Sequence, residues 1–522
     1  MRSKCVRLST VALTILAVMP LSAARLWAQD DAGQASTTTP IKHVVVIFQE
    51  NVSFDHYFAT YPHATPNADG SVYFSKAKEG TPQVNNLETA GLLTNNPNAI
   101  NPFRMDRAFP NTCDQDHVYG DEQFVFHAGL LDGFTGTKPN STALYSCNDP
   151  HYGKFSVMGY FDGNTVTALW NYAQNFAMSD NHYGTTFGPS TPGLLNLLAG
   201  NTYGGTIMKN SPAGFISGGT TFGTVIGDAD PFGDMCSGAT RGQVQMTVGS
   251  SVGDLLNKAG ITWGSFMGGF TSCTQSHVGI TGLNAGADYI PHHAFTQYWA
   301  STLNANHAPP TSNSMIGKSD GVSFHEYDLS LFFTALQQHH LPAVSIVKAA
   351  AYEDGHAGYS DPIDEQFFLV NTLNTLMKSP EWKDTAVLIT WDDSDGWYDH
   401  VMGPIVHQSN APEDQLVGPG NCGTPKPVDA AGDIQNARCG YGPRIPFLVI
   451  SPWAKKNYVD HQVIDQSSIL RFIEDNWNLG RIGGGSSDAI AGSIMGMFDF
   501  DQDSDGSGKL ILDPNTGKVV PD

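Results

Sequence analysis

The sequence of 522 residues predicts an α/β fold with a mainly parallel central sheet, flanking helices and long loop-rich insertions. Three short runs are almost entirely apolar, as expected for strands buried on both faces of a parallel sheet: Val44–Phe48, Ala386–Thr390 and Pro446–Ile450. Helical patterns stand between or after these runs, and strands that alternate with helices indicate a parallel sheet. The 55 glycines and 30 prolines predict many ordered loops on this scaffold.

The clearest helical patterns are Thr191–Ala199, Ile363–Met377 and Ser467–Trp477. Each has apolar residues at helical spacing, and we expect Ser467 to be the N-cap of the last one, because serine readily accepts a hydrogen bond from the first turn.

Residues 1–28 have the pattern of a secretory signal peptide, with basic residues before an apolar run at Val11–Leu21 and small residues after it. We therefore expect a periplasmic or secreted protein, a flexible leader over residues 29–40 and a single domain over residues 41–522. No later segment approaches about 18 apolar residues in a row, so no stable membrane anchor is expected.

The formal net charge is −23. The charged side chains within residues 1–28 are all basic, so removal of this segment makes the chain more acidic. Such an acidic chain argues against nucleic acid as a partner and against docking on anionic lipid. A small anion attracted by a bound metal remains compatible with this charge.

Six cysteines remain after the signal peptide, and an even number in an exported chain predicts disulfides. Their local spacing favours pairs between Cys113 and Cys147, Cys236 and Cys273, and Cys422 and Cys439. Zinc binding is the weaker interpretation, because the sequence contains no CxxC pair.

Polar side chains follow two of the predicted strands. Glu50 and Asn51 come directly after the first strand, and Asp392 and Asp393 come after the second. Ligands gather at the carboxyl ends of parallel strands. Adjacent buried carboxylates repel each other, and a shared divalent cation resolves the repulsion. We therefore predict one or more divalent metal ions there; the alternatives are a solvated acidic loop for the Asp pair and an Asn-capped turn after the first strand.

Ser190 stands just before Pro192, at the start of a predicted helix. Helix N-termini favour anions, so a phosphate could bind beside this hydroxyl. The simpler interpretation is that Ser190 or Thr191 is an N-cap. A serine esterase elbow is disfavoured, because GxSxG requires glycine where this chain has Pro192.

Four histidines in polar, irregular segments could converge on such a phosphate: His117, His292, His293 and His356. Histidines there would neutralise phosphate oxygens and protonate the leaving alcohol. A single histidine in such a segment is more often structural or at the surface.

Taken together, four ordered motifs resemble the bacterial phosphoesterase family, which contains secreted acid phosphatases and phospholipases C and is related to the alkaline phosphatase superfamily. The motifs are Glu50–Phe58 (ENVSFDHYF), Gly188–Pro192 (GPSTP), Thr390–Val401 (TWDDSDGWYDHV) and Arg444–Ala454 (RIPFLVISPWA). The resemblance covers nearly all of the chain after residue 41, so residues 41–522 are expected to be one phosphoesterase catalytic domain with an alkaline-phosphatase-like fold.

The resemblance implies roles for individual residues. Ser190 matches the nucleophile, which also binds the metal, and the histidines at 117, 292, 293 and 356 match those that surround the phosphate in the acid phosphatase branch. The remaining residues that match metal ligands are Glu50, Asn51, Asp392 and Asp393.

The chain departs from the family pattern at a few positions. Val52 replaces a usual arginine, Ala59 a common glycine, and Gly193 stands where asparagine often follows the proline. Gln466 stands where phospholipase members tend to carry histidine, and the accessory modules of longer phospholipases are absent from the C-terminus of this sequence, which favours the phosphatase branch.

The sequence therefore predicts an exported, metal-dependent acid phosphatase that hydrolyses small phosphomonoesters through a phosphoseryl intermediate. The alternative is a phospholipase C or phosphodiesterase that cleaves phosphatidylcholine-type lipids at the headgroup. A metal-stabilised binding protein without catalytic activity is the alternative from another class.

Overall fold

The computed structural model describes Met1 and residues 36–138, 141–210, 222–406, 416–418, 421–422, 440–501 and 508–521. A central sheet of eight strands has the order β11-β10-β12-β1-β13-β16-β4-β17. Its strands are β1 (His43–Gln49), β4 (Ala177–Ser179), β10 (Trp263–Met267), β11 (Glu326–Asp328), β12 (Val344–Lys348), β13 (Thr385–Trp391), β16 (Phe447–Ile450) and β17 (Tyr458–Asp460).

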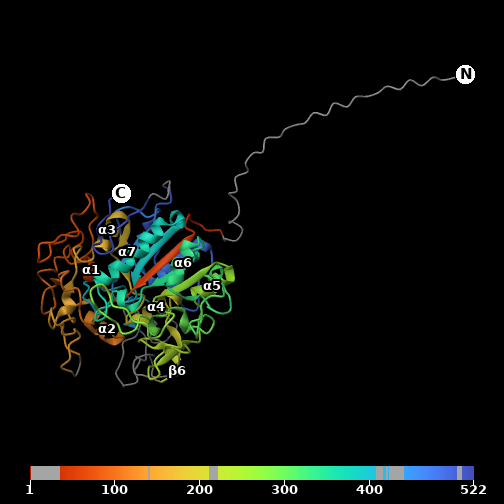
Figure 1. The fold of residues 1–522 in the computed structure, drawn as a ribbon. Helices are drawn as coiled ribbons and strands as arrows, with labels where there is room; N and C mark the ends of the chain where they lie inside the picture. Colours follow the sequence, from red (N-terminus) through yellow and green to blue (C-terminus); the bar gives the residue numbers. More distant parts are fainter. Residues whose placement is uncertain are drawn as a thin grey trace. The chain divides into compact units, whose positions relative to one another are not determined.

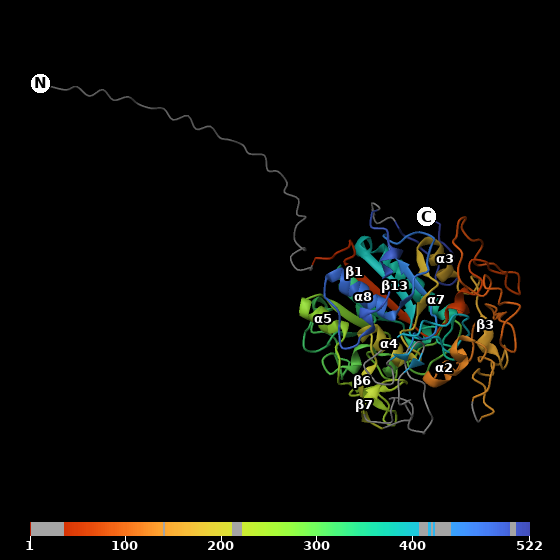
Figure 2. The ribbon, with the colours of Figure 1, turned by 180° about the vertical axis from the view of Figure 1, so that it is seen from behind.

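The predicted α/β fold with a mainly parallel sheet is confirmed. β1 lies between β12 and β13 and is parallel to both. Figure 2 shows β1 (red) beside β13 (cyan). All three predicted strands are present, but the expectation that the run ending at Ile450 is a parallel strand was wrong, because β16 is antiparallel to β13 and β4. An apolar run reports burial on both faces and carries no information on strand direction.

Helices cover the sheet, and the three predicted ones are present. α4 packs against α8 and α3 against α7. Figure 1 shows α6 and α7 in front of the sheet. Figure 2, which is the view from behind, shows α8 in front of the sheet. The helices are α1 (Phe54–Phe58), α2 (Tyr119–Phe126), α3 (Thr167–Asn175), α4 (Ser190–Ala199), α5 (Val252–Ala259), α6 (Ser330–Gln337), α7 (Pro362–Lys378) and α8 (Gln466–Trp477).

The N-cap of α8 is Asp465, so the prediction of Ser467 as the cap was wrong. The Asp465 carboxylate accepts a hydrogen bond from the Ser467 N–H at 3.1 Å, and the Ser468 hydroxyl accepts one from the Asp465 N–H at 3.0 Å. Aspartate and serine are both strong N-cap residues, and this reciprocal pair selects the earlier position.

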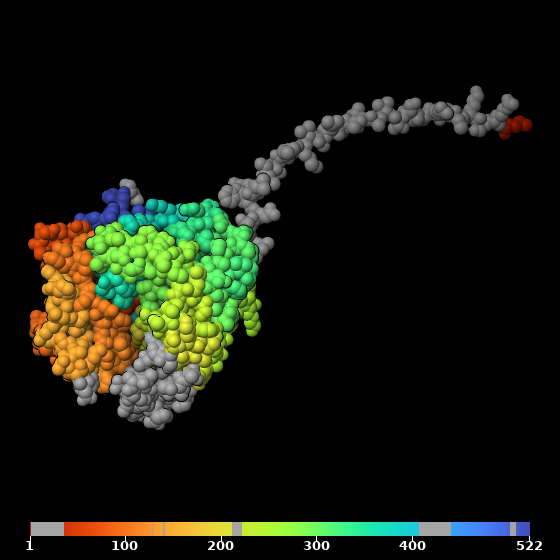
Figure 3. Space-filling model, turned by 60° about the horizontal axis from the view of Figure 1, so that its bottom comes forward, coloured from red at the N-terminus to blue at the C-terminus, as the bar shows by residue number. Residues whose placement is uncertain are grey.

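Long insertions carry short strands of their own. A four-stranded sheet has the order β7-β6-β9-β8, formed by β6 (Tyr203–Lys209), β7 (Phe222–Thr224), β8 (Asp230–Pro231) and β9 (Gln243–Met246). Figure 3 shows the orange segment that follows residue 100 beside the yellow and green segments that follow residue 222. The shorter pairs are β2 (Phe103–Arg104) with β3 (Gly159–Tyr160), β5 (His182–Tyr183) with β18 (Ile464–Asp465), and β14 (Leu416–Gly418) with β15 (Asn421–Cys422).

Two predicted disulfides are confirmed. Cys113 pairs with Cys147, and Cys236 pairs with Cys273. The predicted partner of Cys422, Cys439, lies outside the described residues. Each confirmed pair closes a loop of the insertions, as expected for an exported chain.

Apart from Met1, the predicted signal peptide also lies outside the described residues, as do residues 29–35 of the predicted leader. Residues 36–40 lie against the end of α8, where the Thr38 N–H donates to the Asn476 carbonyl at 2.8 Å. Within the part of the chain that is described, none of the helices has the length and apolar character needed to cross a membrane.

Gly193 allows α4 to approach the end of β13 closely. A Cβ atom at this position would lie 2.3 Å from the Asp392 carbonyl oxygen and 2.8 Å from its carbon. Glycine is therefore required by the contact between α4 and Asp392, and the departure from asparagine at this position has a structural reason. Val52, at another departure, is buried in the core, and its N–H donates to the Asp393 carbonyl at 3.0 Å.

Replacing Gly193 with alanine is expected to lower the free energy of unfolding. Alanine is a better helix former by roughly 0.5–1 kcal/mol, but forcing a methyl group into a filled site typically costs about 1–3 kcal/mol, and here the contacted atoms are backbone. Thermal and urea unfolding of G193A against G496A measure the difference, since a Cβ at Gly496 meets nothing closer than 3.7 Å. Equal stability of the two variants would contradict the contact described above.

Candidate active site

Three adjacent strands end together and supply the charged side chains of the candidate site. Glu50 and Asn51 follow β1, Asp392 and Asp393 follow β13, and Lys348 is the last residue of β12. All five are 2% exposed or less. The alternative of a solvated acidic loop for the Asp pair is therefore wrong, because the sheet and its helices enclose both carboxylates.

Ser190 enters this group from the first turn of α4. Pro189 occupies the N-cap position, so neither Ser190 nor Thr191 caps the helix. The Ser190 hydroxyl instead donates to Glu50 Oε2 at 3.1 Å and lies 3.4 Å from Asp393 Oδ2. The structure thus brings the predicted nucleophile into contact with two of the predicted metal ligands.

The Asn51 carboxamide links the two strand ends. One of its terminal atoms lies 2.8 Å from Asp392 Oδ1 and 2.6 Å from Glu50 Oε2, and the other lies 3.2 Å from His356 Nε2. If the first atom is the oxygen, three oxygens meet at distances that a cation between them, or a proton on one of the carboxyl groups, would favour. If it is the nitrogen, the amide donates to both carboxylates. Which of the two orientations holds depends on His356.

Burial perturbs the carboxyl groups of this region in one direction. It raises the pKa of Glu50 well above the ordinary value, and the neighbouring Asp392 raises it further. Burial also raises the pKa values of Asp393, Asp354 and Asp395 well above their ordinary value. Several carboxylates that are costly to ionise together favour a site that binds positive charge.

Lys348 supplies part of that charge. Its ammonium contacts Glu50 Oε1 and lies 3.4 Å from Asp392 Oδ2. Burial would lower the pKa of Lys348, but Glu50 and Asp392 raise it above the ordinary value. The ammonium is therefore a fixed internal cation beside the carboxylates.

The donor set fits a divalent cation that prefers oxygen. Carboxylate, carboxamide and hydroxyl oxygens are the ligands of hard ions such as magnesium, calcium and manganese. The residues that would hold the ion are Glu50, Asn51, Ser190, Asp392 and Asp393, which are linked by contacts of 2.6–3.4 Å or by chain adjacency.

Three of the four predicted histidines border this group. His293 Nδ1 lies 3.0 Å from Glu50 Oε1, and burial lowers the pKa of His293 well below its ordinary value. The His356 ring approaches Asn51, and burial lowers its pKa as well. His117 differs, because nearby Asp393 and Asp395 raise its pKa well above the ordinary value although burial opposes the charge.

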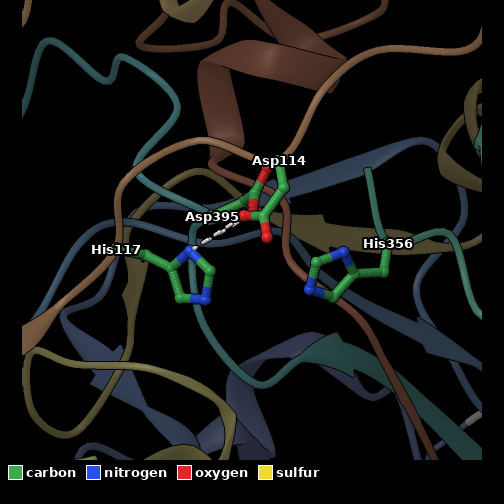
Figure 4. A group of neighbouring side chains, drawn as sticks. All are labelled: Asp114, His117, His356 and Asp395. Atoms are coloured by element: carbon green, nitrogen blue, oxygen red, sulfur yellow. Dashed lines mark ion pairs between the residues drawn. The ribbon is translucent and has the colours of Figure 1, made fainter. Parts of the chain in front are cut away.

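His117 is held by a backbone carbonyl and a carboxylate. Its Nδ1 lies 3.0 Å from the Gln115 carbonyl and 3.3 Å from Asp395 Oδ1. Asp114, His117, His356 and Asp395 form a group whose candidate ligand atoms lie within 4.8 Å of one another. Figure 4 shows the two rings on either side of the two carboxylates, with His117 paired to Asp395.

His292 lies at the margin. Its ring is 3.7 Å from Asp230 Oδ1 and 3.8 Å from Asp228 Oδ2, and its carbonyl accepts a hydrogen bond from the Thr191 hydroxyl at 3.3 Å. Within the described part of the chain, no hydrogen bond or ion pair joins the His292 ring to the predicted metal ligands.

Sequence reasoning missed several charged residues of the site. Lys348 ends an apolar run, Val344–Lys348, and could have been found by the same strand-end rule that selected Glu50. Asp354 and Asp395 lie in loops, where no periodic pattern marks them. Glu122 was missed as well; it accepts hydrogen bonds from the Gly188 N–H at 2.8 Å and the Ser394 hydroxyl at 2.7 Å, and burial raises its pKa to about 7.

The fold and the site together define an α/β protein with a serine hydroxyl and a buried, oxygen-rich cation site at the end of a mainly parallel sheet. Residues 41–480 match the Phosphoesterase family, and the chain belongs to that family.

Three relatives illustrate its similarities. A non-hemolytic phospholipase C of Pseudomonas aeruginosa is 26% identical over 84% of this chain and 54% of its own length. A hemolytic phospholipase C of the same organism is 23% identical over 93% of this chain and 59% of its own length. The non-specific phospholipase C3 of Arabidopsis thaliana is 22% identical over 83% of this chain and 67% of its own length. The chain spans little more than half the length of the two bacterial relatives.

Among solved structures, a protein of the alkaline phosphatase superfamily from Vibrio parahaemolyticus aligns over 62% of each chain, with 12% identity and a TM-score of 0.29. A TM-score of this size supports no inference about activity.

Replacing Lys348 with methionine should destabilise the metal-free protein by about 3–5 kcal/mol, because buried Glu50 loses its partner. The matched variant K138M removes a partly exposed lysine paired with Asp116 and Asp121, where a loss under about 1 kcal/mol is expected. Urea unfolding with a chelator measures both. Added divalent cation should reduce the loss in the free energy of unfolding caused by K348M and leave the loss caused by K138M unchanged. If the cation does not alter the K348M loss, Lys348 and the cation do not neutralise the same carboxylates.

Proposed function

We propose that this protein is a metal-dependent phosphoric ester hydrolase in which Ser190 is the nucleophile. The observation that carries the proposal is the position of the Ser190 hydroxyl, in the first turn of α4 and 3.1 Å from Glu50 Oε2. A serine in an ordinary helix start bonds its own backbone; this one faces buried carboxylates that suit a cation.

A bound divalent ion would lower the pKa of the Ser190 hydroxyl and neutralise charge on the phosphate oxygens. The chain itself contributes the N-terminus of α4, whose dipole and N–H groups favour an anion. Glu50 accepts a hydrogen bond from the Ser190 hydroxyl in the resting arrangement, which fixes the direction of the O–H bond and leaves the Oγ lone pairs available for attack.

In the first step, Ser190 passes its hydroxyl hydrogen to Glu50 Oε2, and Ser190 Oγ attacks phosphorus in line as the bond to the leaving oxygen breaks. His117 is the proposed proton donor to that oxygen, because the Asp395 carboxylate stabilises its imidazolium form. In the second step, neutral His117 takes a proton from water, and the resulting hydroxide attacks the phosphoserine. The bond between phosphorus and Ser190 Oγ breaks, and Glu50 returns the proton to Oγ. His293 and His292 line the phosphate side in this proposal.

Phospholipase C activity on a phosphodiester is the finer proposal. The three relatives described above are all named as phospholipases C. The acid phosphatase prediction has less support, because none of these names is a phosphatase. The acidic surface suits a cationic headgroup such as that of phosphatidylcholine, and export to the periplasm or the medium remains the predicted location.

Acid phosphatase activity is kept as a second candidate because of Gln466. Its amide donates to the Asp392 carbonyl at 2.7 Å and the Trp391 carbonyl at 3.1 Å, and its oxygen accepts from the Thr185 N–H at 3.2 Å. A histidine, as expected in phospholipase members, could not reproduce all three bonds, so the support of Asp392 differs in this chain.

Replacing Ser190 with alanine should reduce turnover by at least about 10³-fold, since the nucleophile of a covalent mechanism is lost. Metal content and the unfolding midpoint should change little. The matched control is S330A, which removes a serine from the same position of α6, where its hydroxyl donates to Asp328. Substantial activity in S190A would exclude Ser190 as the nucleophile, and inactive wild-type protein with bound metal would favour the non-catalytic alternative.

Steady-state rates on p-nitrophenyl phosphate and p-nitrophenylphosphorylcholine separate the two candidate activities. Phospholipase C activity predicts a kcat/KM at least about tenfold higher on the choline diester, a difference of roughly 1.4 kcal/mol in transition-state stabilisation. The reverse preference would restore the acid phosphatase prediction. S190A should abolish hydrolysis of both substrates.

A further inference from the structure

His356 is predicted to contact phosphate, and both of its ring nitrogens also lie close to polar atoms of the protein. Its Nδ1 lies 2.5 Å from the carbonyl oxygen of Ala357, and its Nε2 lies 3.2 Å from a terminal atom of the Asn51 carboxamide. The residue therefore joins a backbone carbonyl on one side to a predicted metal ligand on the other.

The backbone carbonyl fixes the tautomer of the ring. A carbonyl oxygen can only accept, so the hydrogen of neutral His356 resides on Nδ1 and is donated to Ala357. Nε2 then carries a lone pair and can only accept. The Asn51 atom that faces it must be the amide nitrogen, since the amide oxygen has no hydrogen to donate.

This orientation sends the Asn51 oxygen toward Glu50 Oε2 at 2.6 Å and Asp392 Oδ1 at 2.8 Å. Three oxygens in such proximity are the arrangement that a divalent cation requires. The opposite orientation would direct the amide hydrogens at both carboxylates and withdraw the amide oxygen from the cation.

The surrounding loop holds the His356 ring in place. The ring stacks on Tyr359 with centroids 4.3 Å apart, and the His356 N–H donates to Asp354 Oδ1 at 3.0 Å. The Asp354 carbonyl in turn accepts from the Glu50 N–H at 3.1 Å. One short loop therefore contacts both residues that follow β1.

We propose that His356 is a positioning residue that orients the Asn51 carboxamide so that its oxygen faces the metal ion. This inference rests on the metal-dependent function proposed above. Histidines of this kind act through the ligand they orient, and their loss typically costs 10–100-fold in metal affinity.

The test is a double-mutant cycle that measures metal affinity. It separates orientation of the Asn51 amide by His356 from a general role of His356 in holding the loop. The full chain is stripped of metal, and Mn²⁺ binding is followed by the electron paramagnetic resonance of free Mn²⁺. His356→Phe keeps a ring that can stack on Tyr359 and removes Nε2. It should weaken Mn²⁺ binding by about 10–100-fold. His339→Phe, at an exposed histidine after α6, should leave the affinity unchanged.

Asn51→Asp supplies the second arm. A carboxylate has two equivalent oxygens and no amide to orient, so His356→Phe should change the Mn²⁺ affinity of the Asn51→Asp protein by less than about threefold. An equal loss in both backgrounds would show that His356 only supports the loop and would overturn the proposal, as would no loss in either. Absence of Mn²⁺ binding by the unmodified chain would overturn the metal-dependent function itself.

Discussion

The charge balance among buried carboxylates is the interaction on which the rest of the site depends. Glu50, Asp392 and Asp393 are each at most 2% exposed, and among the described residues Lys348 supplies the one ammonium that contacts Glu50 and Asp392. Uncompensated buried charge is expensive, so the arrangement is stable in its ionised form only with further positive charge. A divalent cation would provide it, and in the proposed function the same cation would prepare Ser190 for attack.

The sheet imposes this proximity through its register. Gln49 pairs with Trp391 across the parallel strands β1 and β13, so the next residues on each strand, Glu50 and Asp392, emerge side by side. α4 can approach this edge because Gly193 has no side chain to strike Asp392. A rigid strand pair and one close helix contact thus hold the carboxylates and the Ser190 hydroxyl together.

The four predicted histidines lie in different environments, although all of them occur in similar polar, irregular segments of the sequence. His117 lies beside carboxylates that stabilise its charged form, whereas burial favours the neutral form of His293 and His356. His292 lies between Asp228 and Asp230, away from the predicted ligands. In the proposed function this separation assigns proton transfer to His117 and orientation of Asn51 to His356.

Much of the fold and the site could be predicted from the sequence, because apolar runs mark buried strands and polar residues at their ends are rarely placed there without function. That reasoning located Glu50, Asn51, Asp392, Asp393 and Ser190 before any geometry was known. It could not assign the direction of β16, since burial leaves the same composition in either direction. Nor could it find Asp354 or Asp395, which occupy loops without periodicity.

Only the tertiary structure decided which atoms meet. Whether Ser190 caps its helix or faces carboxylates depends on the packing of α4 against the end of β13, where Ser190 and Asp393 meet although they lie 203 positions apart in the chain. The role of His356 depends on a single backbone carbonyl that selects its tautomer. The sequence by itself determined the types of side chain at the strand ends, because strand patterns are local; their mutual contacts are long-range, and only the folded chain specifies them.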